Sequence, residues 1–448
     1  MCDYYHARMP DNSIGLGRSV MQSFTSIGPM LDLIAVFPLI AIFAGRGLPY
    51  AVIISFLISF TTINTTYQLS RKYSTNGGYY SYTGKVLGKL PGLFIALNYL
   101  AYSVVVLLAI GSFGGYFIYS ALNDFGNASS TVLTLVFSLA FISIVFGIVL
   151  LGLRKSLRFT LIAGTAEAAF ILLISLFMVL KPISQSTAIF PSFMPDGNFF
   201  TGVIFGILAF SGSGSSIFLS EDSRDPKRTP ATGLALSFLI AGLIMIIASF
   251  AVVSFLGNGI ASYAANPAAL LLYIQQKFGF VILFPAVLFL ILSAMNLSVS
   301  YLNALLRSTA KMFSDHIFRG SGLKKSDNTF MAILLAILST TCILAVIYGS
   351  YTSFVYMSSL AGLFFITVHS FSNIALIKQK GSILFSMILP VASLLFLVTV
   401  FVVSVNGFLS GFPDIVYMYL LILLFIVLAL LQARSSKQFF NAIEFNVS

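Results

Sequence analysis

Residues 200–219 read FTGVIFGILAFSGSGSSIFL, an apolar segment whose second half contains six consecutive small residues. A helix that crosses a membrane needs about 20 mainly apolar residues, and this segment has that length. Serine and glycine in series weaken the helix, and any backbone N–H or C=O group that they free inside a bilayer needs another partner. The segment therefore predicts a membrane span that is broken near Gly212 and offers polar backbone groups to a ligand.

A second interrupted span lies earlier in the chain, where Ser26, Ile27, Gly28 and Pro29 follow one another. The offset from Gly28 to Gly212 is 184 residues, close to one repeat of five spans with their loops. Interrupted segments at matching places of two halves are typical of transporters that bind their substrate at mid-membrane. The alternative is a stripe of small residues used only for close helix packing.

The composition of the whole chain also indicates a membrane protein. Of its 448 residues, 58% are hydrophobic and 8% are charged, whereas soluble domains carry about 25% charged residues. A water-soluble enzyme and a disordered chain are thereby excluded. Twelve segments are long enough to span as helices, which places both termini on one side. They comprise residues 22–44, 49–69, 92–120, 131–152, 159–180, 200–219, 232–256, 279–306, 329–348, 351–377, 383–405 and 412–432.

The positive charges are concentrated on one side of these spans. With the N-terminus in the cytoplasm, 21 of the 24 Lys and Arg residues fall in cytoplasmic segments, and Arg46, Lys181 and Lys277 are the exceptions. This asymmetry predicts a multi-pass protein of the cell membrane with both termini in the cytoplasm. The net charge of +11 then reports orientation, and no nucleic-acid partner is expected. No metal-ligand spacing appears among the Cys and His residues, so no metal or cofactor is expected.

Two acidic residues, Asp32 and Glu167, fall inside predicted spans. An ionisable group there is costly and is a functional candidate by default. Because no Lys or Arg lies within a span to neutralise them, we expect each carboxyl to exchange a proton during a transport cycle. Structural alternatives exist for both. Asp32 would suit the first turn of a half-helix that starts at Pro29, and Glu167 follows small residues that favour close helix packing.

Further motifs carry a resemblance to a known family. Residues 210–212 (FSG), followed by residues 221–230 (EDSRDPKRTP), resemble the sixth-helix pattern of the amino acid–polyamine–organocation (APC) superfamily of transporters. Residues 76–84 (NGGYYSYTG) with Gly88 are similar to the family's segment after helix 2, and Arg307 with Ser308 is a weaker third match. The resemblance covers roughly residues 19–432.

The resemblance implies an all-α membrane protein of the amino acid permease type. Twelve transmembrane helices would form a LeuT-type 5+5 inverted repeat with helices 1 and 6 broken, plus two peripheral helices. The corresponding division is a cytoplasmic N-terminal segment (1–21), helices 1–5 (22–182), helices 6–10 (199–378), helices 11–12 (382–432) and a cytoplasmic tail (433–448).

The same resemblance implies a secondary active transporter of amino acids, not an enzyme, that works by alternating access with proton symport. Glu167 and Asp32 would provide the proton coupling. Phe210 would cover the substrate from one side, and Ser213 and Gly214 stand where an aromatic residue and a Glu are common, which would widen the pocket. The predicted substrate-binding residues are Ser26, Ile27, Gly28, Phe210, Ser211, Gly212 and Ser213.

Other functions of the same fold stay open. One is an amino acid/polyamine exchanger or a carrier of cationic amino acids, in which Asp32 would meet the additional amine. Another is a sodium-coupled symporter, for which Ser298 and Ser300 could furnish hydroxyl ligands beside carbonyls of helix 1. The expected partners are accordingly an amino acid or related amine, a coupling proton and the lipid bilayer. The repeated pore or catalytic residue set of a channel or a membrane enzyme is absent from the sequence.

Overall fold

The computed structural model describes residues 14–122, 131–183, 190–191, 199–318, 327–379, 381–445 and 447. Within these ranges most of the chain is helical, and the one β-type contact is an isolated bridge between Ile14 and Ser223. Eleven helical segments in the described part are long and apolar enough to cross a membrane. The predicted class, an all-α membrane protein, is therefore confirmed, while the count of twelve spans stays a prediction.

The first half of the chain contains a helix in three pieces and four long helices. Its elements are α1 (Leu16–Ile27), α2 (Pro29–Ala35), α3 (Phe37–Ala44), η1 (Gly45–Gly47), α4 (Leu48–Lys72), α5 (Tyr79–Leu87), α6 (Lys89–Leu122), α7 (Thr131–Leu150) and α8 (Leu153–Leu180). α1 and α2 are each shorter than a span, whereas the continuous run from α3 to α4 and the helices α6, α7 and α8 are each long enough by themselves.

The second half also begins with an interrupted helix. Its elements are α9 (Phe199–Ala209), η2 (Ser211–Asp222), α10 (Thr229–Leu256), η3 (Gly257–Gly259), α11 (Ile260–Ala265), α12 (Ala269–Phe278), α13 (Phe280–Ser314), α14 (Asp327–Tyr348) and α15 (Ser350–Ile377). The chain continues with η5 (Leu384–Ile388), α16 (Leu389–Gly411), α17 (Pro413–Ser435) and α18 (Lys437–Ala442).

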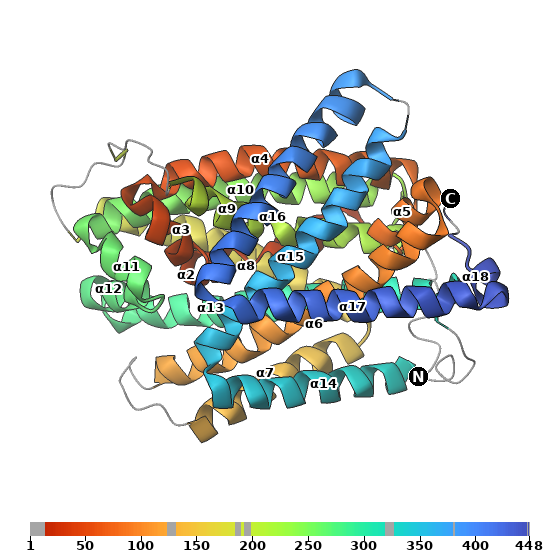
Figure 1. Ribbon diagram of the computed structural model, residues 1–448. Helices are drawn as coiled ribbons and strands as arrows, with labels where there is room; N and C mark the ends of the chain where they lie inside the picture. The colour runs from red at the N-terminus through yellow and green to blue at the C-terminus, as the bar shows by residue number, and fades with distance from the viewer. Residues whose placement is uncertain are drawn as a thin grey trace.

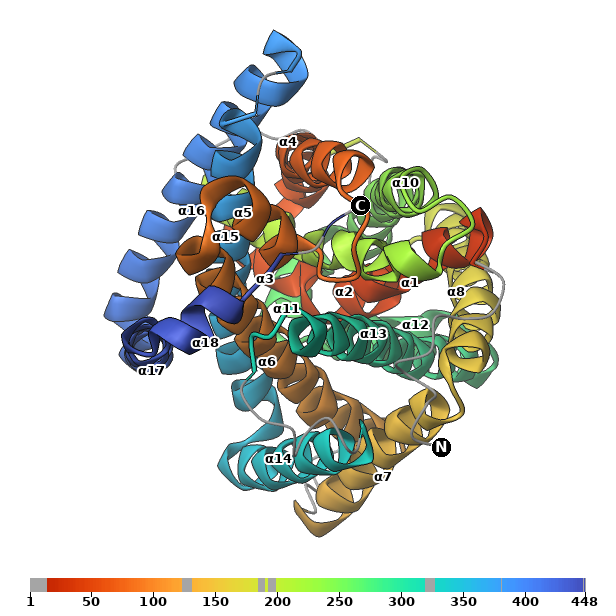
Figure 2. The same cartoon turned by 90° about the vertical axis from the view of Figure 1, so that its right-hand side faces the viewer.

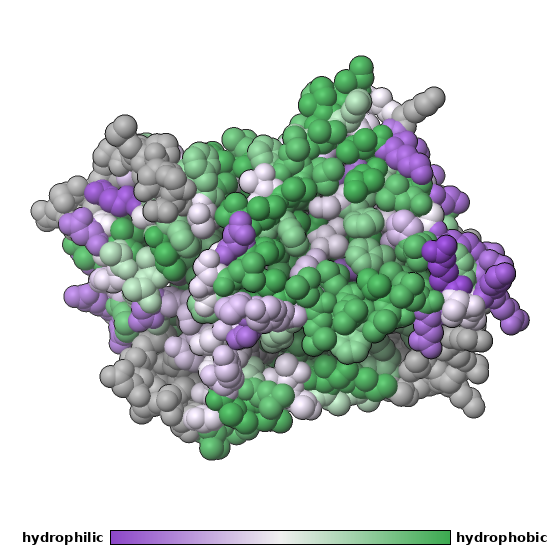
Figure 3. Space-filling view, viewed as in Figure 1, coloured by the Kyte–Doolittle hydropathy of each residue, from purple (hydrophilic) through white to green (hydrophobic). Residues whose placement is uncertain are grey.

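The long helices run across the view of Figure 1, with α11 and α12 at one end and α5 and α18 at the other. Hydrophilic residues gather at these two ends, and an apolar surface lies between them (Figure 3). In the end-on view α16 and α17 lie at one edge, whereas α2 lies near the centre (Figure 2). Every residue of α2 is buried. The broken helix therefore occupies the core, and the last two spanning helices expose apolar side chains where lipid is expected.

Candidate functional site

The first interrupted helix changes direction at Gly28, between α1 and α2. This residue has φ +72° and ψ 58°, a left-handed conformation that glycine adopts without strain. Its lack of a side chain is also required by space, because a Cβ here would lie 2.8 Å from Leu297 Cδ1. Pro29 then begins α2, and proline suits a first helical position because it has no N–H group.

The second interrupted helix changes from α-helical α9 to η2, a 3₁₀ helix of 12 residues. Runs of this length are uncommon, and 3₁₀ segments within a spanning helix often mark a hinge. The backbones of the two interruptions are in direct contact, since a Cβ at Gly212 would collide with the carbonyl oxygen of Ser26. The Ser26 hydroxyl donates to the Gly212 carbonyl at 2.5 Å, and the Ser216 N–H donates to Ser23 Oγ at 3.0 Å.

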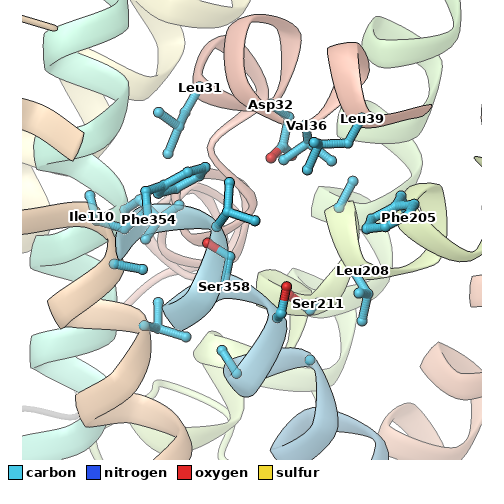
Figure 4. A pocket seen from close by; sticks show the side chains of 18 of the residues that line it. Leu31, Asp32, Val36, Leu39, Ile110, Phe205, Leu208, Ser211, Phe354 and Ser358 are labelled. Carbon is cyan, nitrogen blue, oxygen red and sulfur yellow. The ribbon is translucent and has the colours of Figure 1, made fainter. Parts of the chain in front are cut away.

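A cavity lies beside the contact between the two interruptions (Figure 4). Its open interior is about 130 Å³. Apolar side chains from α2, α6, α9 and α15 form most of the wall, and Ser26, Ile27 and Ser211 contribute to it at the breaks. Asp32 is the one charged residue among the described residues that line it. A mainly apolar hollow with a few polar groups is typical of a small-molecule site.

Asp32 points toward this cavity from the first turn of α2 (Figure 4). The residue is 5% exposed, and its Oδ2 atom has no hydrogen-bond partner within the described part of the chain. A buried carboxylate without a partner is unfavourable. A proton or an organic cation in the cavity would supply the missing interaction.

Glu167, from α8, lies beside the first turn of α2 and is fully buried. Its Oε1 atom accepts hydrogen bonds from Ser293 Oγ at 2.6 Å and from the Met30 N–H at 3.1 Å, and Oε2 accepts one from Asn296 Nδ2 at 3.4 Å. The Leu31 N–H in turn donates to Ser293 Oγ at 3.2 Å. Glu167 thus accepts from the Met30 N–H group that the helix break frees, a role that the sequence suggested for Asp32 in the first turn of this half-helix.

The other predicted substrate residues are distributed unevenly around the cavity. Gly28, Gly212 and Ser213 lie at the interruptions but outside the described lining of this cavity. Phe210, expected to cover the substrate, packs against Phe56 and Phe238, with ring centroids 5.8 and 5.5 Å away, and those two rings stack on each other at 4.7 Å. Its ring belongs to an aromatic cluster with α4 and α10 and lies outside the described cavity lining, so its contact with a substrate stays a prediction.

The two serines considered for sodium have different surroundings. Ser300 Oγ lies 2.7 Å from Thr25 Oγ1, a contact between α13 and α1. Ser298 Oγ is buried and has no hydrogen-bond partner among the residues described. The two hydroxyls are therefore not joined in one hydrogen-bonded group, and their role in sodium coupling stays a prediction.

Several residues of the site were not predicted from the sequence. Tyr102 and Tyr301 both line the cavity, and their hydroxyl groups lie 2.6 Å apart. Ser293 and Asn296 hold Glu167 from α13. The available signal was the polar residues within the apolar span 279–306, but serine and asparagine are common enough in such spans to be inconclusive.

The end of the molecule that contains α5 is closed by a buried polar cluster. Asn76 Nδ2 donates to Asp222 Oδ2 at 3.1 Å, and the backbone N–H groups of Asn76 and Glu221 donate to each other's side chains at 3.2 and 2.8 Å. Arg307 Nε lies 3.5 Å from Asp222 Oδ2, and both side chains are almost fully buried. The acidic pair that follows η2 therefore fastens this helix to α13 and to the segment before α5.

A second connection at this end joins α5 to the last turn of α13. Tyr80 OH donates to Asp315 Oδ2 at 3.1 Å, and Lys311 Nζ lies 2.6 Å from Asp315 Oδ1. Burial, with the neighbouring Asp315 carboxylate, raises the pKa of Tyr80 well above its usual value. The phenol thus keeps its proton and remains a donor throughout the physiological pH range.

Broken helices around a cavity, inside an all-helical membrane protein, define the class as a membrane transporter. A comparison with protein families gives the same class: the amino acid permease family matches residues 19–438. The chain therefore belongs to the amino acid permease family of the APC superfamily, and the predicted resemblance is confirmed. A sequence search of curated proteins gives no match. Family membership makes the protein a transporter of amino acids in a membrane.

Proposed function

We propose that this permease is a proton-coupled amino acid symporter that works by alternating access. The observation that carries the proposal is Asp32, a buried carboxyl group with a free oxygen atom in a cavity beside both helix interruptions. The substrate ammonium group would bind Asp32 together with carbonyl groups at the end of α1, because the last carbonyls of a helix lack intrahelical partners. Ser26, Ile27 and Ser211 would contact the rest of the substrate backbone.

Alternating access would follow from the asymmetry of the two ends. The cavity lining extends from the breaks toward Leu39 in α3 and Phe408 in α16, whereas the Asn76–Asp222–Arg307 cluster closes the α5 end. With the α5 end in the cytoplasm of the cell, as the positive charges predict, this is a state closed to the inside. Transport would require η2 to separate from α13 and release the Asp222–Arg307 contact.

The coupling proton would bind Glu167. Protonation removes the negative charge that favours the hydrogen bonds from Met30 and Ser293, since bonds to a carboxylate are stronger than bonds to a neutral acid. Weaker bonds would release α2 from α8 and α13 and allow the broken helix to move. Asp32 would meanwhile be neutralised by the substrate ammonium group, so that neither carboxyl group is a charge without a partner while the helices move.

A second candidate function is favoured by the same cavity. Since Asp32 is the one charged residue among its described lining residues, a substrate with an additional amine would complement the cavity better than a neutral amino acid. A carrier or exchanger of cationic amino acids or polyamines would use the same breaks, without net proton movement in the case of exchange.

Uptake by the purified protein in proteoliposomes tests both functions. Radiolabelled amino acids and diamines are offered in sodium-free buffer, with an acidic exterior or with no gradient. If the protein is a symporter, the substrate should accumulate in the vesicles and a protonophore should abolish this accumulation. Uptake that is unchanged by the protonophore would refute proton coupling. An exchanger needs substrate inside the vesicle, whatever the pH gradient. Glu167→Gln should remove the response to the gradient if Glu167 carries the proton, and should preserve it if the residue is structural.

A further inference from the structure

A second, smaller cavity lies next to the substrate cavity, on the side of α5. Its open interior is about 20 Å³, enough for one group of the size of a water molecule or an ammonium, against about 130 Å³ in the first cavity. Tyr102, Ser211 and Tyr301 line both cavities and so form a common wall. The hydrogen bond between the two tyrosine hydroxyls, at 2.6 Å, holds this wall closed. A substrate that moves from Asp32 toward the α5 end would reach the second cavity directly behind the wall.

The second cavity is lined mainly by aromatic rings. The His369 ring lies between those of Phe365 and Tyr79, with centroid distances of 4.1 and 4.8 Å. Tyr99 stacks on Phe218 with a centroid distance of 4.5 Å. The described lining contains no Asp, Glu, Lys or Arg. Faces of aromatic rings attract cations, and rings on several sides are a known way to bind organic ammonium groups.

One polar atom in this lining lacks a partner. His369 is 4% exposed, and its Nδ1 atom has no hydrogen-bond partner among the described residues. Buried polar side-chain atoms in native proteins nearly always have a partner. An imidazole nitrogen beside an aromatic cavity can accept a hydrogen bond from an ammonium N–H. This bond would give His369 Nδ1 the partner that the described residues do not provide.

We propose that this chamber, defined by Tyr79, Tyr99, Phe365 and His369, is a second binding site that takes the ammonium group of the substrate on its way to the α5 end. The inference rests on the proposed transport of an amine-bearing substrate. Asp32 would bind the ammonium group by charge, and the chamber would bind it by ring faces and the His369 nitrogen. The weaker second site would let the substrate leave, while separation of the Tyr102 and Tyr301 hydroxyls would join the two cavities.

The first test separates transport from binding, with L-lysine as the probe. His369→Phe keeps an aromatic ring but removes the nitrogen acceptor. It should lower the maximal rate of uptake at least fivefold in proteoliposomes, while the equilibrium dissociation constant for L-lysine changes less than twofold. His369→Gln retains an acceptor and should recover part of the rate. His316→Asn, at an exposed histidine whose positive φ of 59° asparagine tolerates, is the control and should behave as wild type. A wild-type maximal rate in His369→Phe would overturn the proposal, and so would an equal loss of binding.

The second test does not depend on transport. In a full-length protein with Cys2 and Cys342 changed to Ser, Val368→Cys places a thiol in the chamber lining. A methanethiosulfonate reagent with a primary ammonium group should modify it at least tenfold faster than the sulfonate reagent, after normalisation to a free thiol. Adding Tyr79→Leu and His369→Leu should reduce this preference. Equal normalised rates, or no modification by either reagent, would refute the chamber even if L-lysine is transported. Selective modification without L-lysine uptake would instead support the chamber and count against the proposed function.

Discussion

Asp32 belongs to the short helix α2, and Glu167 accepts a hydrogen bond from the start of the same helix, yet the two buried acids have different surroundings. Glu167 accepts hydrogen bonds from Met30, Ser293 and Asn296 and lies outside the described cavity lining. Asp32 faces the cavity, and its Oδ2 atom lacks a partner within the described residues. Burial of a carboxyl group in a membrane protein is therefore not enough to identify its role. The number of hydrogen-bond donors around a buried carboxyl group indicates whether it holds neighbouring helices together or is free to bind a ligand.

This comparison has a direct energetic consequence. A hydrogen bond to a charged group contributes about 1.5–3 kcal/mol, whereas a buried polar atom without a partner costs about 1–3 kcal/mol. Glu167 should accordingly stabilise the folded protein. Asp32 should destabilise the protein without substrate, because its free oxygen atom finds a partner only when the substrate binds. Substitutions at the two positions should move stability and transport in different directions.

Removal of the Glu167 side chain should have the largest effect on stability. Glu167→Ala leaves the Met30 N–H and the Ser293 hydroxyl without their acceptor in an apolar interior, which should cost about 3 kcal/mol or more. Because the chain contains no tryptophan, thermal unfolding in detergent is best followed by far-ultraviolet circular dichroism. A melting temperature equal to that of wild type would show that Glu167 is not an anchor.

Neutralisation of Asp32 should affect the substrate and leave the fold intact. Asp32→Asn removes the charge that would bind the substrate ammonium group, so affinity should fall roughly 10- to 100-fold, corresponding to about 1.5–3 kcal/mol. The melting temperature without substrate should stay the same or rise, since a costly buried charge is removed. Isothermal binding and circular dichroism on the same preparation check both parts. A loss of stability with unchanged affinity would reverse the roles assigned to the two acids.

Ser293 tests the connection between Glu167 and α2. Ser293→Ala removes the 2.6 Å bond to Glu167 and the acceptor for the Leu31 N–H, and should lower stability by about 1–3 kcal/mol. If the two groups act together, the effects of Ser293→Ala and Glu167→Gln should be non-additive by at least about 0.5 kcal/mol in a double-mutant cycle. Additive losses would mean that the residues act independently.

Asn296 should give the smallest effect of the series. Its contact with Glu167 is long, at 3.4 Å, and its own Oδ1 atom has no partner among the described residues. Asn296→Ala removes both a weak bond and an unpartnered oxygen, so stability should change by less than about 1 kcal/mol. A loss as large as that of Ser293→Ala would indicate that Asn296 is a principal donor to the carboxylate.

Much of the general architecture could be predicted because its signals are local. Apolar runs of about 20 residues must be helical in a bilayer, since each backbone group then finds its partner within the same segment. Gly28 beside Pro29 marks the junction of α1 and α2 for a similarly local reason, since one residue tolerates a positive φ and the other begins a helix.

The details of the site depended on contacts between distant segments. Phe210 stands beside a helix interruption in the sequence, yet its ring packs with Phe56 and Phe238 from two other helices. The wall of Tyr102 and Tyr301 joins residues 199 positions apart. No local pattern records such a pairing, because it arises from how spanning helices pack side by side.

The sequence by itself determined that the chain lies in a membrane, that small residues interrupt two of its apolar segments, and that Asp32 and Glu167 are its acids within predicted spans. Only the tertiary structure decided which of these acids is satisfied. The donors to Glu167 come from α2 and α13, 126 to 137 residues away in the chain, and the cavity that leaves Asp32 open is formed by several helices together. A carboxyl group's partners in a bilayer are set by the helices packed against it, and its own sequence neighbours do not specify them.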